Sequence, residues 1–560
     1  MSGTDSTGGA DTAGSTAPGT DDGVLRHSSV MAAGTIVSRL TGVLRTTALA
    51  AALGSLGVLA DAYNTANTLP NIIYILLVGG ALNAVFIPQL VGHMKDDKDG
   101  GTAYADRLLT LCAMTLLGIT VVAVAAAPWI ARLYAGASYT PRQIEVLTAF
   151  AYLCLPQILF YGLYALYSQV LNARGHFAAP MFAPVINNVV VIVGCGIFLT
   201  VTHEPSISTI TGGQIALLGT ATTLGVVVQA SVLTPFMARS GYRFRPRFDL
   251  RGQGLGKAAG LAKWTIFFVL VNQVSYLIVT RLANNAGAVA ESHGVRGAGS
   301  TAYANAHLMF ILPHSIVTVS VITALMPRMS RAAHAGNLAA VRHDLARGMR
   351  LVAAAMIPAT VLLILLGPRI AQLLLGYGNT SDPGARLVGT VLQGFAVGGL
   401  AYSVYYVLLR GFFALEDTRT PALVNIFLNI VNVGVGYTLF RLLPADHAVV
   451  GLAVGYAVAY IATTVVFWQI LRPRVGGLDT YVTIRTFVRL GVAGVVSGLL
   501  GYALVAALAH VTGSGKVGAL VVVVAVGTLV PVAFVLVARR LRVAEMTEVV
   551  NLVTGRLRRG

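Results

Sequence analysis

The chain is poor in charged residues and in cysteine. Only 11% of its 560 residues are charged, whereas a soluble domain carries about 25%. With 56% hydrophobic residues as well, the chain cannot cover itself with a water-compatible surface, which excludes a soluble globular fold. The three cysteines Cys112, Cys154 and Cys195 lie in apolar segments. They have neither metal-ligand nor disulfide spacing, so a zinc site and a disulfide framework are excluded too.

Acidic residues are scarce, and this argues against an enzyme. The chain has 21 Asp and Glu residues, most of them in the N-terminal tail or in loops. It has no closely spaced pair of acidic residues that would suit a metal ion, no glycine-rich phosphate loop and no His-Glu-x-x-His motif. We therefore predict a protein that is not an enzyme, uses no cofactor and does not pump with ATP. The sequence identifies no coupling ion.

Long apolar runs are what the chain does contain. A membrane-spanning helix needs about 20 mostly apolar residues. The sequence predicts an all-α integral membrane protein with fourteen such segments. Their approximate ranges are 29–54, 62–92, 104–131, 145–172, 180–201, 213–237, 258–284, 302–327, 350–375, 386–409, 420–440, 448–471, 486–509 and 516–538.

The basic residues predict the orientation. With the N-terminus inside, 28 of the 39 Lys and Arg residues fall in cytoplasmic segments, eight fall outside and three lie within spans. This is the positive-inside pattern, so we predict that both termini are cytoplasmic. A formal charge of +18 is also typical of nucleic-acid binding, but the charges sit in short loops between apolar runs. We therefore predict no nucleic-acid partner and a location in the bacterial cytoplasmic membrane.

A weak internal repeat organises the spans. Five short matches recur in order at offsets of 236 to 240 residues, which places six spans in each copy. Parallel repeats of this kind build two lobes around a central site in many transporters. The matched positions are Val37-Ser38 with Val274-Ser275, Ala62-Tyr63 with Ala302-Tyr303, Pro88 with Pro327, Arg174-Gly175 with Arg410-Gly411, and Pro184 and Asn188 with Pro421 and Asn425.

The repeat and the charges divide the chain into six parts. The predicted parts are a disordered cytoplasmic tail (1–27), an N-terminal lobe of six spans (28–238), a basic cytoplasmic linker (239–257), a C-terminal lobe of six spans (258–475), two extra spans (476–540) and a basic cytoplasmic tail (541–560). The linker alternates arginine with aromatic residues. We interpret this pattern as a topology signal that contacts anionic membrane lipids.

Two arginines lie inside the first apolar segment, Arg39 and Arg45. An arginine near mid-bilayer costs roughly 2.5–3.5 kcal/mol on insertion scales, so both are expected to face a wet cavity. The alternative is that they snorkel to the interface or pair with a structural carboxylate. Six residues of helix separate them by roughly 120° around the axis and about 9 Å along it. They could border one wide cavity at two depths, which suits a large anionic substrate.

Other polar residues mark the second span of each lobe. Asp61 opens the span in the first lobe, either as a cap of its own helix or in a functional role, and Pro70-Asn71 interrupts that span. In the second lobe, His307 and His314 share a helix face with Tyr303. A buried histidine is usually structural, but this face is also consistent with a polar cavity wall.

These residues resemble the MurJ/MviN family of lipid II flippases, within the multidrug/oligosaccharidyl-lipid/polysaccharide (MOP) exporter superfamily. The resemblance covers about residues 28–540. The motifs that carry it are Ser38-Arg39-Leu40-Thr41-Gly42-Val43-Leu44-Arg45, Ala60-Asp61-Ala62-Tyr63, Leu69-Pro70-Asn71, Ala84-Val85-Phe86-Ile87-Pro88, Leu171-Asn172-Ala173-Arg174-Gly175-His176-Phe177 and the stretch from Arg410 to Pro421.

The resemblance implies a function and a set of site residues. It implies translocation of lipid II, the lipid-linked peptidoglycan precursor, from the inner to the outer leaflet. Arg39 and Arg45 would then hold the pyrophosphate of the substrate. The positions that match the family's central cavity are Ser38, Arg39, Arg45, Asp61 and Asn71.

The chain also departs from the family pattern at two cationic positions. The family often has an arginine after Pro-Asn in span 2, which here falls near Tyr74, and another in span 8, where this chain reads Asn305-Ala306-His307-Leu308. We therefore add His307 to the predicted substrate-binding residues. An actinobacterial variant with a histidine in its cavity, or a paralogue that moves another lipid-linked glycan, would explain the departure.

Several functions stay open at this point. Besides lipid II translocation, a MOP-type exporter of another polyprenyl-linked glycan or of drugs fits the pattern. So does a non-transporting envelope scaffold or an integral-membrane glycosyltransferase. Partners would be the lipid-linked glycan, membrane lipids and cell-wall synthesis or division proteins.

The topology can be tested at the linker. A single cysteine introduced next to Arg247 is expected to resist an impermeant thiol reagent added to intact cells, because the charge distribution places residues 239–257 in the cytoplasm. Permeabilised cells provide the control, in which the same cysteine should react. Efficient labelling in intact cells would overturn the predicted orientation.

Overall fold

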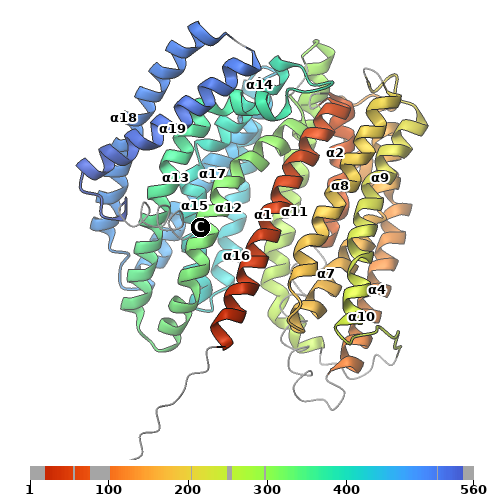
Figure 1. Cartoon of the computed structure of the whole chain (residues 1–560), viewed down its shortest axis with the longest axis horizontal. Coiled ribbons are helices and arrows are strands. Elements are labelled where there is room, and N and C mark those ends of the chain that lie inside the picture. The colour runs from red at the N-terminus through yellow and green to blue at the C-terminus, as the bar shows by residue number, and fades with distance from the viewer. Residues whose placement is uncertain are drawn as a thin grey trace, which may run out of the picture.

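The computed structural model describes residues 19–54, 57–75, 101–202, 205–248, 255–295, 298–513 and 515–546. Within these ranges the chain is built of helices and contains no strand, which confirms the predicted all-α class (Figure 1). The helices are α1 (Gly19–Leu53), α2 (Val58–Tyr74), α4 (Thr102–Ala125), α5 (Ala127–Tyr134), α6 (Pro141–Cys154), α7 (Gln157–Ala173), α8 (Ala178–Val201), α9 (Gly212–Ser231), α10 (Leu233–Arg239), α11 (Leu255–Ser292), α12 (Ser300–His334), α13 (Leu338–Leu375), α14 (Asp382–Ala396), α15 (Gly399–Ala414), α16 (Arg419–Leu442), α17 (Ala448–Arg474), α18 (Thr480–Thr512) and α19 (Lys516–Arg540).

Most of the predicted spans coincide with membrane-length helices. Eleven helices of the described chain are long and apolar enough to cross a membrane, and the bent pair α14 and α15 makes a twelfth. The first two predicted spans fall on α1 and α2. The structure describes α2 only as far as Tyr74, with one further residue at its C-cap. The count of fourteen therefore stays a prediction, while a multi-pass membrane protein is established.

Parts of several predictions lie outside the described residues. These parts are most of the N-terminal tail, the segment 76–100 with Pro88, six residues of the basic linker (249–254) and the chain after residue 546.

The helix packing repeats between the two halves of the chain. In the first half α1 packs on α8, α2 on α6, and α9 on both α6 and α8. In the second half the corresponding pairs form in the same order, since α11 packs on α16, α12 on α14, and α17 on both α14 and α16. Figure 1 shows these halves as the orange-to-yellow and green-to-blue sides of the molecule. We call them the N-lobe and the C-lobe.

Side-chain amides join equivalent helices in both lobes. In the N-lobe, the Nδ2 of Asn188 on α8 donates to the backbone oxygen of Ser38 on α1 at 3.3 Å. In the C-lobe, the Nδ2 of Asn425 on α16 donates to the backbone oxygen of Phe268 on α11 at 3.2 Å. Polar side chains of this kind hold helices together where lipid supplies no hydrophobic driving force.

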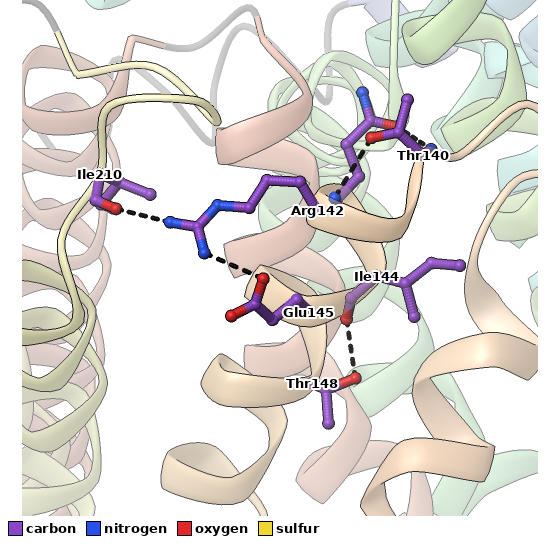
Figure 2. A network of polar contacts seen from close by, with 7 residues as sticks. Thr140, Arg142, Ile144, Glu145, Thr148 and Ile210 are labelled. Atoms are coloured by element: carbon purple, nitrogen blue, oxygen red, sulfur yellow. Dashed lines mark hydrogen bonds and ion pairs between the residues drawn. The ribbon is translucent and has the colours of Figure 1, made fainter.

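A capping box begins α6 in the N-lobe. Thr140 and Gln143 exchange side-chain and backbone hydrogen bonds at the start of α6, which satisfies amide groups that the helix itself cannot. Arg142 then bridges the Glu145 carboxylate at 3.0 Å and the backbone oxygen of Ile210 at 2.9 Å (Figure 2). These bonds tie the start of α6 to the loop that precedes α9.

The hairpin of α18 and α19 lies outside the repeat. Both helices pack on α13 of the C-lobe, and Figure 1 shows them at the edge of the molecule. Buried Val522, Val526 and Val530 meet Leu366 there. The hairpin is therefore attached to the C-lobe alone.

Close packing in the C-lobe depends on glycine. An added Cβ at Gly455 on α17 would lie 2.6 Å from the backbone nitrogen of Gly436 on α16, whereas one at Gly434 would meet nothing within 4 Å. We expect Gly455→Ala to destabilise the purified protein by about 1–3 kcal/mol through overpacking. Gly434→Ala should be neutral or stabilise by roughly 0.5–1 kcal/mol, because alanine favours the helix. Thermal unfolding in detergent measures both, and equal melting temperatures would contradict this account of the packing.

Candidate functional site

The two lobes meet near one end of the membrane-spanning helices. The meeting point comprises the end of α1, the start of α2, the end of α11 and the start of α12. The charge distribution predicts that this end is the outer one. Two carboxylates, one from each lobe, bridge the lobes there.

Asp61 of α2 caps a helix of the opposite lobe. Its Oδ1 accepts the backbone N–H of Thr301 at 2.7 Å and the Ser300 hydroxyl at 3.4 Å, and both donors lie in the first turn of α12. A helix N-terminus carries unsatisfied N–H groups and partial positive charge, so it favours a carboxylate. Only 3% of Asp61 is exposed.

Glu291 makes the reciprocal contact. It lies near the end of α11 in the C-lobe, and its Oε2 accepts the backbone N–H of Val58 at 2.7 Å. Val58 is the first residue of α2, the helix that carries Asp61. Each lobe therefore supplies the acid that caps a helix of the other lobe, and we call this pair of contacts the carboxylate clasp.

The clasp requires glycine beside it. A Cβ at Gly299 would lie 1.7 Å from Asp61 Oδ2, and a Cβ at Gly287 would lie 2.5 Å from the same atom. Tyr139 lies in the loop before α6. Burial first, and then the charges of Asp61 and Glu291, raise the pKa of its phenol well above the usual value. Tyr139 is therefore a neutral neighbour of the two carboxylates.

Further polar bonds surround the clasp. Asn284 Nδ2 donates to Thr65 Oγ1 at 3.1 Å and to the backbone oxygen of Tyr134 at 2.9 Å. On the α1 side, Thr380 Oγ1 donates to the backbone oxygen of Ala50 at 2.9 Å. Apolar contacts accompany these bonds, since Ala288 of α11 packs in the core of the N-lobe and Ala50 of α1 packs in that of the C-lobe.

A cavity of about 300 Å³ lies between the lobes beside the clasp. We call it the arginine cavity, because Arg45 is the one charged residue that lines it. Its other lining residues are Gly42, Thr46, Leu49, Ala50, Leu53, Gly54, Ala60, Tyr63, Asn64, Asn67, Asn188, Thr301, Ala304, Asn305 and Leu308. Asn67 Oδ1 and Thr301 Oγ1 are buried atoms with no hydrogen-bond partner among the described residues. The cavity thus offers one guanidinium and spare polar atoms to a ligand.

Arg39 lies on α1 further from the clasp. Its guanidinium donates to the Ser315 hydroxyl of α12, a contact across the two lobes, and its side chain is exposed. Six residues of helix place it about 9 Å from Arg45 along α1. Arg39 does not line the arginine cavity.

A second cavity, of about 640 Å³, adjoins the first along α2 and α12. No charged residue lines it. We call it the amide cavity, because its lining is rich in amides and tyrosines: Thr68, Asn71, Asn272, Gln273, Ser275, Tyr276, Thr280, Ser300, Tyr303, His307, Asn429, Asn432, Tyr456 and Tyr460, with apolar residues between them. Ala304 and Leu308 of α12 line both cavities.

The predicted site residues are distributed over these features. Arg45 lines the arginine cavity, and Asn71 and His307 line the amide cavity. The Nε2 of His307 is 3.2 Å from the Tyr456 hydroxyl. His314 instead bonds Ser403 Oγ at 3.0 Å and is buried inside the C-lobe, so it does not belong to a cavity wall.

Ser38 and Asp61 line neither cavity. The backbone oxygen of Ser38 serves the contact between α1 and α8. Asp61 is not the cap of its own helix, where Gly57 holds the N-cap position without a side-chain bond. Nor is α2 interrupted at Pro70, because the helix continues through it to Tyr74.

The sequence interpretation missed Glu291 and the amides around Arg45. Glu291 is an isolated acid at the end of an apolar run, just before the glycine-containing loop that leads to α12, and this was the available signal. No sequence signal marked the amides as cavity residues, because asparagine is also common at helix ends and in turns. These amides are Asn64, Asn67 and Asn305.

Known proteins resemble the chain over most of its length. The family model described as "Lipid II flippase MurJ" matches residues 49–526. A probable lipid II flippase MurJ of Rhizobium meliloti is 27% identical over 455 residues, which cover 80% of this chain and 81% of the relative. The lipid II flippase MurJ of Burkholderia cenocepacia is 26% identical over 479 residues, which cover 83% and 87% of the two chains.

Solved structures share the fold. A lipid II flippase MurJ in an inward closed conformation has a TM-score of 0.69 at 17% identity, and the match covers 90% of this chain and 97% of that one. An inward-facing multidrug resistance MATE family transporter of the MOP superfamily has a TM-score of 0.61 at 14% identity, covering 79% and 96%. At these identities the structural matches establish the fold alone.

The clasp predicts a measurable change in access from outside. Asp61→Asn should raise the labelling of a cysteine introduced at Ala304 by an external impermeant reagent, in a chain without the three native cysteines. Loss of a charged hydrogen-bond acceptor should destabilise the closed arrangement of the lobes by about 1.5 kcal/mol. This corresponds to a roughly tenfold larger open population and roughly tenfold more labelling. Glu145→Gln removes an exposed acid that bonds within the N-lobe and serves as the matched control. Equal labelling in the parent and in Asp61→Asn would show that the clasp does not hold the lobes together.

Proposed function

The chain belongs to the MurJ family of lipid II flippases, and we propose that it moves lipid II across the cytoplasmic membrane by holding the pyrophosphate at Arg39 and Arg45. It is a transporter of this membrane and not an enzyme. Its two lobes would expose the site to the inner and outer leaflets in turn.

One observation carries the assignment of the site. Arg45 lines a cavity between the lobes, next to a clasp that closes one end, and Arg39 lies on the same helix toward the other end. Arginine presents a planar fork of donors that matches phosphate oxygens, and it keeps its charge in a poorly hydrated site. Two arginines whose backbone positions lie about 9 Å apart along the helix suit a pyrophosphate that advances from one to the other.

The conformation supports loading from the cytoplasmic leaflet. The clasp and the bonds around it join the lobes at the end that the charge distribution places outside. Release to the outer leaflet then requires these bonds to break while the lobes close at the opposite end, as in other two-lobe transporters. Because the bonds are polar, water can replace them when the lobes separate.

The amide cavity is suited to bind the uncharged glycan part of the lipid II headgroup. Asparagine and glutamine amides donate and accept hydrogen bonds, as sugar hydroxyl and acetamido groups do. The tyrosine rings add apolar faces. Since Ala304 and Leu308 line both this cavity and the one that holds Arg45, pyrophosphate and glycan would lie in adjoining spaces along one helix.

The assignment predicts the effect of removing each arginine. Arg39→Ala and Arg45→Ala should each lower lipid II translocation by about tenfold or more, since a charged hydrogen bond contributes roughly 1.5–3 kcal/mol. Membrane insertion should not suffer, because the arginines are costly to insert. Accessibility of lipid II at the outer leaflet, in cells depleted of their own flippase, measures the effect.

Lys263→Ala is the matched control. Lys263 is the third basic residue inside a predicted span, and its side chain is exposed beside Trp264 and lines neither cavity. The Lys263→Ala variant should translocate lipid II as the parent does, at equal abundance in the membrane. Normal translocation by Arg39→Ala and Arg45→Ala would exclude them as the pyrophosphate site, even if the protein remains a flippase.

A further inference from the structure

The outer end of α1 is held by the C-lobe, although the helix packs mainly on α8 of the N-lobe. Donors from the loop after α13 reach the last turn of α1. The backbone N–H of Asn379 donates to the oxygen of Ala51 at 3.0 Å, and its Nδ2 donates to the oxygen of Ala52 at 2.9 Å. The bond from Thr380 Oγ1 to the oxygen of Ala50 completes the set.

These bonds cap the C-terminal end of α1. The carbonyl groups of the last turn of a helix have no partner within it, so a buried helix end needs donors from elsewhere. Thr47 of α1 makes the reciprocal contact, since its Oγ1 donates at 2.9 Å to the backbone oxygen of Leu374 in the last turn of α13. Each of the two helices therefore receives a C-terminal donor from the other lobe. We call the loop 376–380, with its bonds to α1, the latch.

The latch fits closely around the end of α1. Gly378 has a φ of +59°, and a Cβ there would lie 2.6 Å from the backbone oxygen of Ala51. The Nε2 of Gln372 donates to Oδ2 of Asp382 at 3.0 Å, which ties together the two helix ends that the loop connects. The latch therefore has a defined shape that matches the end of α1.

The latch adjoins the arginine cavity. Ala50, which the latch holds, lines this cavity together with Arg45. Six residues of helix, about 9 Å along the axis, separate Arg45 from Ala51. Because α1 is one continuous helix as far as Leu53, the position of its outer end sets the position of Arg45.

We propose that Asn379 and Thr380 are positioning residues for translocation. They hold the outer end of α1 against the C-lobe while the outer side is closed, and α1 must leave them before Arg45 can face the outer leaflet. The clasp joins the N-terminal ends of α2 and α12, and the latch joins the C-terminal ends of α1 and α13, so the outer side opens only when both are broken. The role of Arg45 here rests on the proposed function, whereas the hold on α1 does not.

External labelling of a cysteine at Ala304 measures the hold of the latch, in a chain without the three native cysteines. Asn379→Asp keeps the shape of the side chain but replaces the donor to Ala52 with an acceptor, so labelling should rise about fivefold or more. Gln393→Glu is the matched control, because Gln393 Nε2 donates to the backbone oxygen of Ile364 at 2.6 Å within the C-lobe. Size-exclusion profiles show that each variant is folded. Equal labelling of Asn379→Asp and Gln393→Glu would overturn the proposal.

A disulfide tests whether α1 has to leave the latch. A Cβ at Gly54 would lie 3.8 Å from the Cβ of Asn379, which is a typical separation in disulfides. In the double variant Gly54→Cys and Asn379→Cys, lipid II translocation should be lost on oxidation and return on reduction, while neither single variant responds to the oxidant. The comparison is made within one variant, so the strain of a side chain at Gly54 affects both measurements equally. Absence of the cross-link, or unchanged translocation by the cross-linked chain, would overturn the proposal.

The two tests distinguish a failure of the latch from a failure of the proposed function. A parent chain that moves no lipid II would contradict the proposed function, and the labelling at Ala304 would still decide whether the latch holds the lobes. A chain that moves lipid II while cross-linked would remain a flippase in which α1 stays on the C-lobe.

Discussion

The reciprocal capping of helices by Asp61 and Glu291 determines the state in which the molecule is seen. Each carboxylate neutralises the N-terminal amides of a helix in the other lobe, so each lobe supplies a charge that the other lobe needs. Buried N–H groups and carboxylates are costly when unpaired. The outer end therefore stays closed unless water or a new partner satisfies all of these groups together. This closure shuts off the arginine cavity at the end where the clasp lies.

The contrast between the lobe interiors and the lobe interface explains how such a protein can move. Inside each lobe, large apolar side chains such as Phe150 and Phe395 are completely buried. Between the lobes, hydrogen bonds that water can replace accompany a few apolar contacts, such as that of Ala50 with the C-lobe core. A rigid-body motion of the lobes would exchange these bonds and leave most of each lobe's interior packed, as alternating access requires. The hairpin of α18 and α19 would move with the C-lobe.

Some local contacts can be recognised in a sequence because they join near neighbours. The Oδ1 of Asp417, in the loop before α16, accepts the backbone N–H of Thr420 at 2.9 Å in the first turn of that helix. Burial tends to raise the pKa of this carboxyl, but the bonds from Thr420 and the ion pair with Arg474 lower it below its usual value. A sequence can show that Asp417 caps a helix that starts within three residues of it. It cannot show that Arg474 forms an ion pair with the same carboxylate, because the two residues are far apart in the chain.

The sequence alone determined the all-helical membrane fold, the repeat and the two arginines, because apolar run length, loop charge and the insertion cost of arginine are properties of short segments. Tertiary structure decided which groups share a cavity. It placed the Asp61 carboxylate at the start of α12 and not at the start of its own helix, and it set the reciprocal contact of Glu291 beside it. It also placed Asn71 and His307 in one cavity and Arg45 in the adjoining one. These contacts join residues more than 200 positions apart, and their partners are backbone amides that every residue except proline carries. A residue pattern cannot identify such partners, because only the packing of the two lobes selects them.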